Sequence, residues 1–490
     1  MPPPPATARE LALRVLLDSR HFARERLDTA LQRTPLSSAD RGLATELVYG
    51  VLRRRRSLDA LLRPHTDRPP DRVSAEVWEL LRLGAYQLVY LSHVPPHAAI
   101  YETVELTKRR AAKAACFVNG VLRSVSRSIT GDTLAMPAAD ALPLTNGVYR
   151  RLTRPILPEP TARPGDYVAN AFSLPGWLAE RWLARYGWEE TTRLGFWFAA
   201  PAPLWVRVNP LRTTRDQLRE AFAAAGVAAE PGPHPQSLRL AGHLPIRSLP
   251  GYDEGWFTVQ DLSAMAVASA LAPEPGMTVL DLCAAPGGKT THLAELMNNT
   301  GRILACDANA RRLRTVGDLC ERLGVTIAET CLLASRERQR SEYCQKRYPP
   351  VADAPGSPFD AALVDAPCSN TGVLGRRPEV RWRLTPADLL ELVQLQIDLL
   401  RRACEQVRPG GAVVYSTCSI EPEENGGAVR AVLEQLNDWS LEAEQEHRPG
   451  LPADGGYRAR LRRLTSRAAN ANAAAPSNAS VPGSGTTPGV

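Results

Sequence analysis

Four short apolar runs alternate with helix-length segments in the second half of the chain, and this alternation restricts the fold more than any other feature. The runs cover residues 279–282, 303–306, 361–364 and 412–415. Strands separated by helices form parallel sheets, because each crossover returns the chain to the same edge. We therefore expect an α/β domain whose parallel sheet is covered by helices.

A glycine-rich turn follows the first run: residues 281–290 read Asp-Leu-Cys-Ala-Ala-Pro-Gly-Gly-Lys-Thr. Gly287 and Gly288 let the backbone bend tightly and approach a ligand, and the next helix offers free N–H groups. A phosphate loop would need glycine where Cys283 stands, which weighs against nucleotide hydrolysis. Asp307 ends the next run, where nucleoside-binding sheets place a carboxylate against ribose hydroxyls. A ribose-bearing cofactor fits both features, although an ordinary turn and a helix cap would explain each alone.

Two cysteines follow the last two runs. Cys368 ends the motif Asp365-Ala-Pro-Cys, and Cys418 lies in Thr-Cys-Ser. Reacting groups converge at strand ends in open α/β sheets, and a thiolate is a strong nucleophile. The pair therefore predicts thiol chemistry beside the cofactor turn. Core positions are expected for four other cysteines, which lie in apolar or helical contexts: Cys116, Cys306, Cys320 and Cys404.

Composition bounds the class of protein. A chain of 490 residues predicts about three domains, and its formal charge of +7 is compatible with a polyanionic partner. The nine cysteines contain no Cys-x-x-Cys pair and follow no secretory leader, so we expect free thiols and a cytoplasmic protein. No run approaches the ~18 apolar residues of a membrane span, so no membrane association is expected.

The pattern along the chain divides it into five parts. Residues 1–130 carry helical periodicity and predict a helical bundle, and residues 131–166, rich in Pro, Ala and Thr, predict a linker. Residues 167–252 predict a small α+β module and residues 253–465 the α/β domain. Residues 466–490 have almost no bulky apolar side chains and predict a disordered tail. The charged, proline-rich segment 335–358 predicts an irregular insertion.

Taken together, residues 281–290, the Asp365-Ala-Pro-Cys motif and the Thr-Cys-Ser motif resemble the S-adenosylmethionine-dependent RNA cytosine-5 methyltransferases of the RsmB (Sun) type, which act on small-subunit (16S) ribosomal RNA. The resemblance spans nearly the whole chain. Residues 94–97 and 117–123 resemble parts of the family's NusB-like helical RNA-binding domain. The resemblance implies an all-α NusB-like domain, a small α+β module and a Rossmann-like methyltransferase domain.

The resemblance also implies a role for each motif. Cys418 would attack carbon 6 of cytosine, Cys368 would help to release the methylated product, and Asp365 would lie between cofactor and base. No metal is implied. The S-adenosylmethionine site would be formed by Cys283, Ala284, Ala285, Pro286, Gly287, Gly288, Lys289, Asp307 and Asp365.

Arginines after the Asp-Ala-Pro-Cys motif are the candidate contacts to ribosomal RNA. Arg376, Arg377 and Arg381 combine guanidinium groups with an aromatic neighbour, as backbone and stacking contacts do. The alternative is a solvated, salt-bridged loop. Residues 53–56, four consecutive arginines, predict either phosphate contacts or an ordinary charged helix face. We expect a monomer.

Three departures from the family pattern keep other functions open. Residues 331–335 replace an acidic adenine-contacting turn, residues 454–457 alter the terminal strand motif, and Asn370 stands where the family usually has glycine. A non-catalytic RNA-binding assembly factor is one alternative, which the intact cysteines oppose. A cytosine-5 methyltransferase acting on transfer RNA or DNA is another, which only the NusB-like domain opposes.

Overall fold

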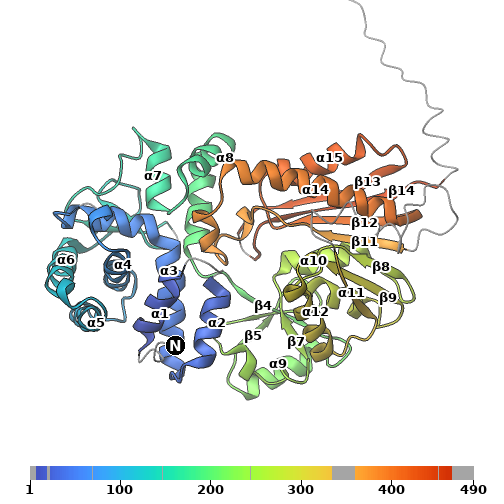
Figure 1. Ribbon diagram of the computed structural model, residues 1–490, viewed down its shortest axis with the longest axis horizontal. Coiled ribbons are helices and arrows are strands. Elements are labelled where there is room, and N and C mark those ends of the chain that lie inside the picture. The colour runs from blue at the N-terminus through green and yellow to red at the C-terminus, as the bar shows by residue number, and fades with distance from the viewer. Residues whose placement is uncertain are drawn as a thin grey trace, which may run out of the picture.

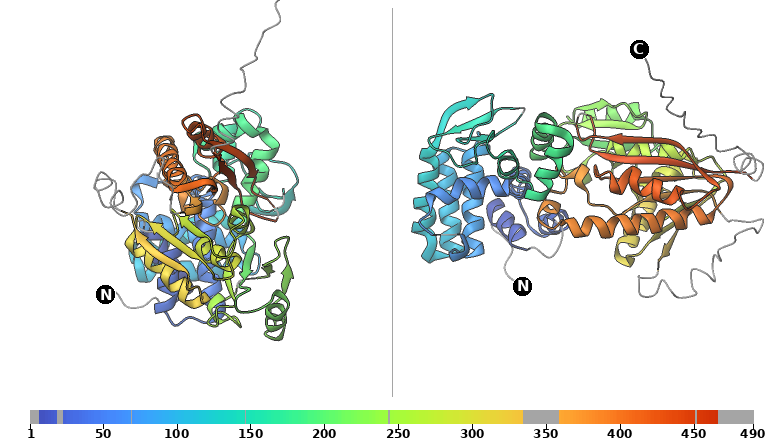
Figure 2. Two further views of the ribbon diagram at one scale, coloured as in Figure 1. Left: turned by 90° about the vertical axis from the view of Figure 1, so that its right-hand side faces the viewer. Right: turned by 90° about the horizontal axis from the view of Figure 1, so that it is seen from above.

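The computed structural model describes residues 7–18, 23–68, 70–145, 147–242, 244–333, 359–450 and 452–465. The predicted insertion 335–358 and the predicted tail 466–490 lie outside these residues. The helical N-terminal part lies at one end of the long axis, and the large sheet lies at the other (Figures 1 and 2). Within the described ranges, no helix is long and apolar enough to cross a membrane.

The N-terminal part is a bundle of helices, as predicted. Side-chain oxygens of Thr7, Ser37 and Ser74 accept backbone N–H bonds at the starts of α1, α3 and α4, which fixes where these helices begin. Their apolar faces meet in one core. The helices are α1 (Ala8–Leu17), α2 (Ala23–Arg33), α3 (Ser38–Leu62), α4 (Ala75–Tyr90), α5 (Pro96–Arg110) and α6 (Ala115–Ser128).

The segment expected to be a linker contains a small sheet, so that prediction is wrong for much of residues 131–166. Strands β1 (Ile129–Leu134), β2 (Ala141–Pro143) and β3 (Tyr149–Leu152) pair antiparallel in the order β1-β3-β2. Leu142 and Leu152 are buried in the core of the helical bundle. These few apolar side chains anchor the segment although its composition is that of a loop.

Helices α7 (Pro164–Ala171) and α8 (Gly176–Ala199), most of which the sequence placed in the α+β module, pack against the bundle. Phe172, Trp182 and Phe198 are fully buried in the same core as α1, α3 and α4. The tryptophans of α8 therefore pack toward the N-terminal part. The core of the bundle therefore continues through α8.

The small α+β module follows as predicted. Its strands are β4 (Leu204–Val208), β5 (Ala229–Pro231), β6 (Ser237–Leu240) and β7 (Phe257–Val259), and α9 (Arg215–Ala224) packs on them. The strands form an antiparallel sheet in the order β5-β6-β4-β7.

The large sheet has the order β10-β9-β8-β11-β12-β14-β13. The first five strands are parallel, as predicted, and β14 pairs antiparallel with both β12 and β13. Their bounds are β8 (Thr278–Asp281), β9 (Arg302–Asp307), β10 (Ala328–Leu332), β11 (Phe359–Asp365), β12 (Val407–Thr417), β13 (Trp439–His447) and β14 (Gly456–Arg463).

Helices cover both faces of this sheet. Helices α10 (Leu262–Leu271), α11 (Gly288–Leu296) and α12 (Ala310–Leu323) pack on one face, and α14 (Pro386–Gln406) and α15 (Ala428–Leu433) pack on the other (Figure 1). The strand order reverses between β8 and β11, which lie side by side. Open α/β sheets bind ligands at the carboxyl ends of strands at such a point.

Candidate functional site

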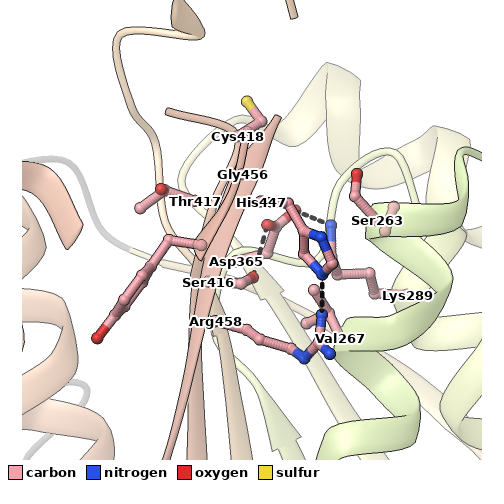
Figure 3. A pocket seen from close by; sticks show the side chains of 12 residues that line it. Ser263, Val267, Lys289, Asp365, Ser416, Thr417, Cys418, His447, Gly456 and Arg458 are labelled. Carbon is pink, nitrogen blue, oxygen red and sulfur yellow. Dashed lines mark hydrogen bonds and ion pairs between the residues drawn. The ribbon is translucent and has the colours of Figure 1, made fainter. Parts of the chain in front are cut away.

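A pocket with about 330 Å³ of empty space lies at the carboxyl ends of β11 and β12, next to the start of α11. In Figure 3 the Cys418 sulfur lies at one side of this pocket, and Lys289 reaches toward Asp365 from the opposite side. The pocket is lined by Ser263, Ala264, Val267, Lys289, Asp365, Ser416, Thr417, Cys418, His447, Gly456, Tyr457 and Arg458.

The two motif cysteines are in contact: Cys368 Sγ and Cys418 Sγ are 3.2 Å apart. The register of the sheet explains the contact, because Asp365 of β11 pairs with Ser416 of β12 and the cysteines follow these residues closely. Cys368 is buried and Cys418 is partly exposed toward the pocket. The convergence predicted from the strand ends is therefore present.

The contact makes the two thiols unequal. A hydrogen bond from the Cys368 thiol lowers the pKa of Cys418, and the same bond raises the pKa of Cys368. Burial acts against the Cys418 thiolate, but the positive charges of Arg377 and Lys289 favour it. Because a thiolate is the reactive form of cysteine, Cys418 is the better nucleophile of the pair.

Asp365 is held on both carboxylate oxygens. Lys289 Nζ donates to Oδ2 at 2.6 Å, and Ser416 Oγ donates to Oδ1 at 2.9 Å. Burial opposes the Lys289 ammonium, yet the neighbouring Asp365 carboxylate raises the pKa of Lys289. The pocket therefore presents a charged carboxylate and a charged ammonium beside the Cys418 sulfur.

A buried carboxylate behind the pocket, which was not predicted from the sequence, joins the two cysteine segments. The Ser369 backbone N–H donates to Glu424 Oε1 at 2.8 Å, and the hydroxyls of Ser369 and Ser419 donate to Oε2. Gln396 Nε2 also donates to Oε1, at 2.9 Å. The signal was a serine directly after each motif cysteine, because each serine reaches the same carboxylate.

The glycine-rich turn bends tightly at Gly287 and is tied to the end of β9. Gly287 has a φ of 102°, and a Cβ there would lie 3.1 Å from the Val316 backbone. Asp307 lies at the end of β9, where its carboxylate accepts the backbone N–H of Ala285 at 3.3 Å. Asp307 and Asp365 thus end strands on either side of β8, the strand that leads into the turn.

A buried ion pair, also not predicted from the sequence, fixes this turn to the small module. Arg207 of β4 is fully buried and donates to both Glu295 oxygens, at 2.7 and 2.8 Å. It also donates to the backbone carbonyl of Gly288 at 2.7 Å. The sequence had predicted only that Arg207 lies in the small α+β module.

The buried carboxyl of Asp281 gives a pH-dependent prediction. Burial raises its pKa to about 7, whereas an aspartate in an unfolded chain titrates near ~3.9. The folded state therefore binds this proton more tightly, and its contribution to stability is complete below about pH 4 and is lost as pH rises to 7. Asp281→Asn removes the ionisation, so from pH 4 to pH 8 the variant should gain on the order of 3 kcal/mol relative to the parent. Thermal midpoints at pH 4, 6 and 8 measure this. Parallel pH curves for the two proteins would contradict it.

Two of the three arginines predicted to contact RNA, Arg376 and Arg381, bind groups of the protein instead. Arg381 is 2% exposed, and it donates to the backbone carbonyls of Arg53, Phe172 and Phe198 at 2.6–3.2 Å. Arg376 is held by the carboxylates of Asp261 and Asp454. The prediction that Arg381 touches RNA is wrong, because its guanidinium joins the helical part to the large domain. Arg377 is exposed.

The four consecutive arginines of α3 also bind protein groups. Arg53 and Arg54 are 7% and 4% exposed. Arg53 Nε donates to Gly375 O at 3.0 Å, and Arg54 Nη1 donates to Pro143 O at 2.8 Å. Neither of the two predictions for these arginines, phosphate contacts or a solvated helix face, describes the surroundings of Arg53 and Arg54. Among the cysteines expected in the core, Cys306, Cys320 and Cys404 are buried, but Cys116 is exposed.

Comparison with known proteins agrees with this architecture. The model of the family described as 16S rRNA methyltransferase RsmB/F matches residues 268–464. The NusB family model matches residues 6–127, and the model of the RsmF/B-like ferredoxin-like domain matches residues 174–247. The match to NusB coincides with the helical bundle.

Whole-chain relatives carry the same family name. The chain is 37% identical over 442 residues to a probable ribosomal RNA small subunit methyltransferase B from Synechocystis sp., covering 89% of this chain and 91% of that one. It is 33% identical over 446 residues to the one from Bacillus subtilis, covering 90% and 91%. The crystal structure of PH0851 shares the fold, with a TM-score of 0.74, 23% identity and coverage of 93% and 98%. The chain belongs to the RsmB/F family of ribosomal RNA small subunit methyltransferases, which confirms the resemblance noted in its motifs.

Proposed function

We propose that this protein methylates carbon 5 of a cytosine in 16S ribosomal RNA, using S-adenosylmethionine and a transient bond between Cys418 and the base. The observation that carries the proposal is the contact between two thiols at the rim of a pocket that also holds Lys289 and Asp365. A methyl transfer to an oxygen or an exocyclic nitrogen has no use for such a thiol pair, since those atoms are nucleophiles already.

Carbon 5 of cytosine is a poor nucleophile, and covalent catalysis solves that problem. The Cys418 thiolate adds to carbon 6, and the electron pair of the carbon 5–carbon 6 double bond becomes available at carbon 5. Carbon 5 then takes the methyl group, the carbon 5 proton leaves to a base, and the carbon–sulfur bond breaks. The last step returns the thiolate, and the neighbouring Cys368 thiol stabilises it by its hydrogen bond.

Asp365 and Lys289 suit the edge of a cytosine. The base presents an amino donor at position 4 and acceptors at N3 and O2, and the pocket offers a carboxylate and an ammonium 2.6 Å apart. Negative charge develops on the ring when the thiolate adds, and the nearby ammonium stabilises that charge electrostatically. A flipped or single-stranded base is required, because the sulfur must approach the face of the ring.

S-adenosylmethionine supplies an electrophilic methyl group when it is bound. The residues present fit it: the turn 283–289 brings small side chains and a bent backbone to the sheet edge, and Asp307 ends β9 where a ribose diol would be held. Asp365 ends β11, on the other side of β8, and would separate this cofactor from the target base. RNA would meet the exposed Arg377 at the mouth of the site.

The test is methylation of defined nucleic acids by the purified full-length protein. Unmethylated 16S rRNA, transfer RNA and DNA are each incubated with S-adenosylmethionine carrying a labelled methyl group. One portion of each product is digested to nucleosides to identify the labelled base, and an intact portion is mapped by bisulfite sequencing. We expect 5-methylcytidine at one position of the 16S rRNA alone. Label in transfer RNA alone, or in DNA alone, would show that this nucleic acid is the substrate and that 16S rRNA is not. Label in a nucleoside other than 5-methylcytidine would overturn the proposed chemistry, and no label in any arm would favour the assembly-factor alternative.

A further inference from the structure

His447 brings an imidazole to the pocket that holds Lys289, Asp365 and Cys418. Strands β12 and β13 both pair antiparallel with β14, so they run in the same direction and end at the same edge of the sheet. His447 is the last residue of β13, and Cys418 directly follows β12. The topology of the sheet therefore places the imidazole at the edge where the Cys418 sulfur lies.

The strand pairing also sets the separation between His447 and Cys418. His447 pairs with Gly456 of β14, and a Cβ at Gly456 would lie 2.7 Å from the carbonyl oxygen of Thr417 at the end of β12. Adjacent strands are about 4.8 Å apart, so two strand spacings put the backbones of His447 and Cys418 roughly 10 Å apart. Gly456 lies between them without a side chain (Figure 3). One pyrimidine ring can bridge this separation when it is bonded to one side chain and hydrogen-bonded to the other.

A hydrogen bond from Arg458 determines which nitrogen of His447 carries the proton. Arg458 Nη1 and His447 Nε2 are 2.9 Å apart. A guanidinium stays protonated and can only donate, so Nε2 accepts and the proton of the neutral imidazole is on Nδ1. Burial and the charge of Arg458 lower the pKa of His447, against the opposing charge of Asp261, so the ring is neutral at pH 7. His447 therefore offers an N–H donor at Nδ1 and has no lone pair left to act as a base.

A donor at this place suits the one polar atom of cytosine that Asp365 and Lys289 leave unmatched. The amino group at position 4 suits the Asp365 carboxylate, and N3 beside it suits the Lys289 ammonium, which lies 2.6 Å from that carboxylate. O2 follows on the other side of N3. When a thiolate adds to carbon 6, negative charge spreads onto N3 and O2, because both are conjugated with carbon 5. A fixed N–H group that meets developing charge stabilises the transition state more than the ground state.

We propose that His447 donates from Nδ1 to O2 of the target cytosine, and that Arg458 is the positioning residue that keeps the proton on Nδ1. The inference rests on the proposed function. The imidazole keeps its proton throughout: the Cys418 sulfur bonds to carbon 6, the electron pair of the carbon 5–carbon 6 double bond spreads onto N3 and O2, and it returns to carbon 5 when the methyl group is taken up. Gln445 holds Arg458 in turn, because its Oε1 accepts from Arg458 Nη2.

The first measurement is the protonation of His447 in the full-length protein without RNA or cofactor. Nitrogen-15 NMR of protein labelled at histidine distinguishes protonated from unprotonated ring nitrogens, and the signals missing from His447→Asn identify those of His447. At pH 7 we expect a proton on Nδ1 and none on Nε2. A proton on Nε2, or on both nitrogens, would overturn the inference. Arg458→Met should move the proton toward Nε2, and an unchanged spectrum in that variant would refute the role of Arg458.

The second measurement tests the contact with O2 by exchanging this oxygen for sulfur, which is a weak acceptor. Single-turnover methylation by the full-length protein is compared for 16S rRNA that carries either cytidine or 2-thiocytidine at the mapped target position. The proteins are the parent, His447→Leu, His447→Asn and Arg458→Met. Leucine fills similar space without a donor, whereas the asparagine amide places an N–H group close to the position of Nδ1.

We expect His447→Leu to methylate the normal RNA about 10–100-fold more slowly at saturating RNA, with little change in RNA affinity, as for the loss of one donor to a developing charge. The ratio of the rates with cytidine and with 2-thiocytidine should be about tenfold larger in the parent than in His447→Leu, because the parent uses the oxygen. His447→Asn should keep the ratio of the parent. Arg458→Met should show a reduced ratio as well, so the comparison does not depend on a single variant.

Equal ratios in the parent, His447→Leu and Arg458→Met would overturn the inference and leave the proposed function intact, because the parent would still methylate carbon 5. A parent protein that labels no nucleic acid would refute the proposed function, and the contact with O2 would fall with it. The two failures are therefore distinguished by the parent protein on normal RNA.

Discussion

Cys418→Ala should abolish methyl transfer, whereas Cys368→Ala should leave the protein covalently attached to its RNA. Without the Cys418 sulfur carbon 5 is not activated, so we expect the rate to fall by at least about a thousandfold. Cys368 Sγ lies 3.2 Å from Cys418 Sγ, and its thiol stabilises the sulfur that must leave carbon 6. Without it, attack continues but release stalls, and a slower band containing protein and RNA should appear on a denaturing gel.

The cysteine variants need a control for the loss of a thiol as such. Cys116 is exposed and lies on α6 of the helical bundle, so Cys116→Ala should methylate at the parent rate and form no adduct. Cys418→Ala should give no adduct band, whereas Cys368→Ala should give one. The gel therefore distinguishes the roles of these two cysteines. An adduct that accumulates in Cys418→Ala, and not in Cys368→Ala, would exchange the roles of the two residues.

Arg381→Met should destabilise the whole protein, although the sequence had placed Arg381 among the RNA contacts. Its guanidinium satisfies backbone carbonyls of α3, of the α7–α8 connection and of α8 in a buried junction. Methionine fills similar space but donates nothing, so these carbonyls lose their partners in a dry environment. We expect a loss of about 3–5 kcal/mol, seen as a lower thermal midpoint.

Arg377→Gln is the matched control for this prediction, because Arg377 is exposed and lies four residues earlier in the same segment. It should melt like the parent and bind RNA more weakly, with a shallower dependence of affinity on salt. The folded fraction of Arg381→Met at low temperature should bind RNA like the parent. If Arg381→Met melted normally and lost RNA affinity, the buried position of its guanidinium would not describe the protein in solution.

The large domain could be predicted from sequence because local patterns determine it. Apolar runs at strand length, a glycine pair after the first run and cysteines after the last two gave the parallel strands and the meeting of Cys368 with Cys418. Register supplied the rest: Asp365 opposite Ser416 places both sulfurs at one edge. These features depend on short segments of the sequence, so the site could be predicted before the structure was known.

Contacts between distant segments could not be predicted in this way. Arg53 and Arg381 are 328 residues apart, and nothing around either arginine shows that each will be buried against the other's segment. Charged side chains are normally solvated, so the pattern favoured RNA contacts or an open helix face. The buried positions of Glu424 and Arg207 were not predicted for the same reason, since a buried charge is recognised only through the partners that surround it.

The central claim is that the Cys418 sulfur forms a bond to carbon 6 of a cytosine. The most direct measurement is tandem mass spectrometry of the Cys368→Ala protein after incubation with 16S rRNA and S-adenosylmethionine, followed by nuclease and protease digestion. The account predicts one modified peptide, residues around Cys418, carrying a methylated cytidine on the Cys418 sulfur. A cytidine on any other residue, or unmodified Cys418 peptide in protein that has turned over, would contradict it.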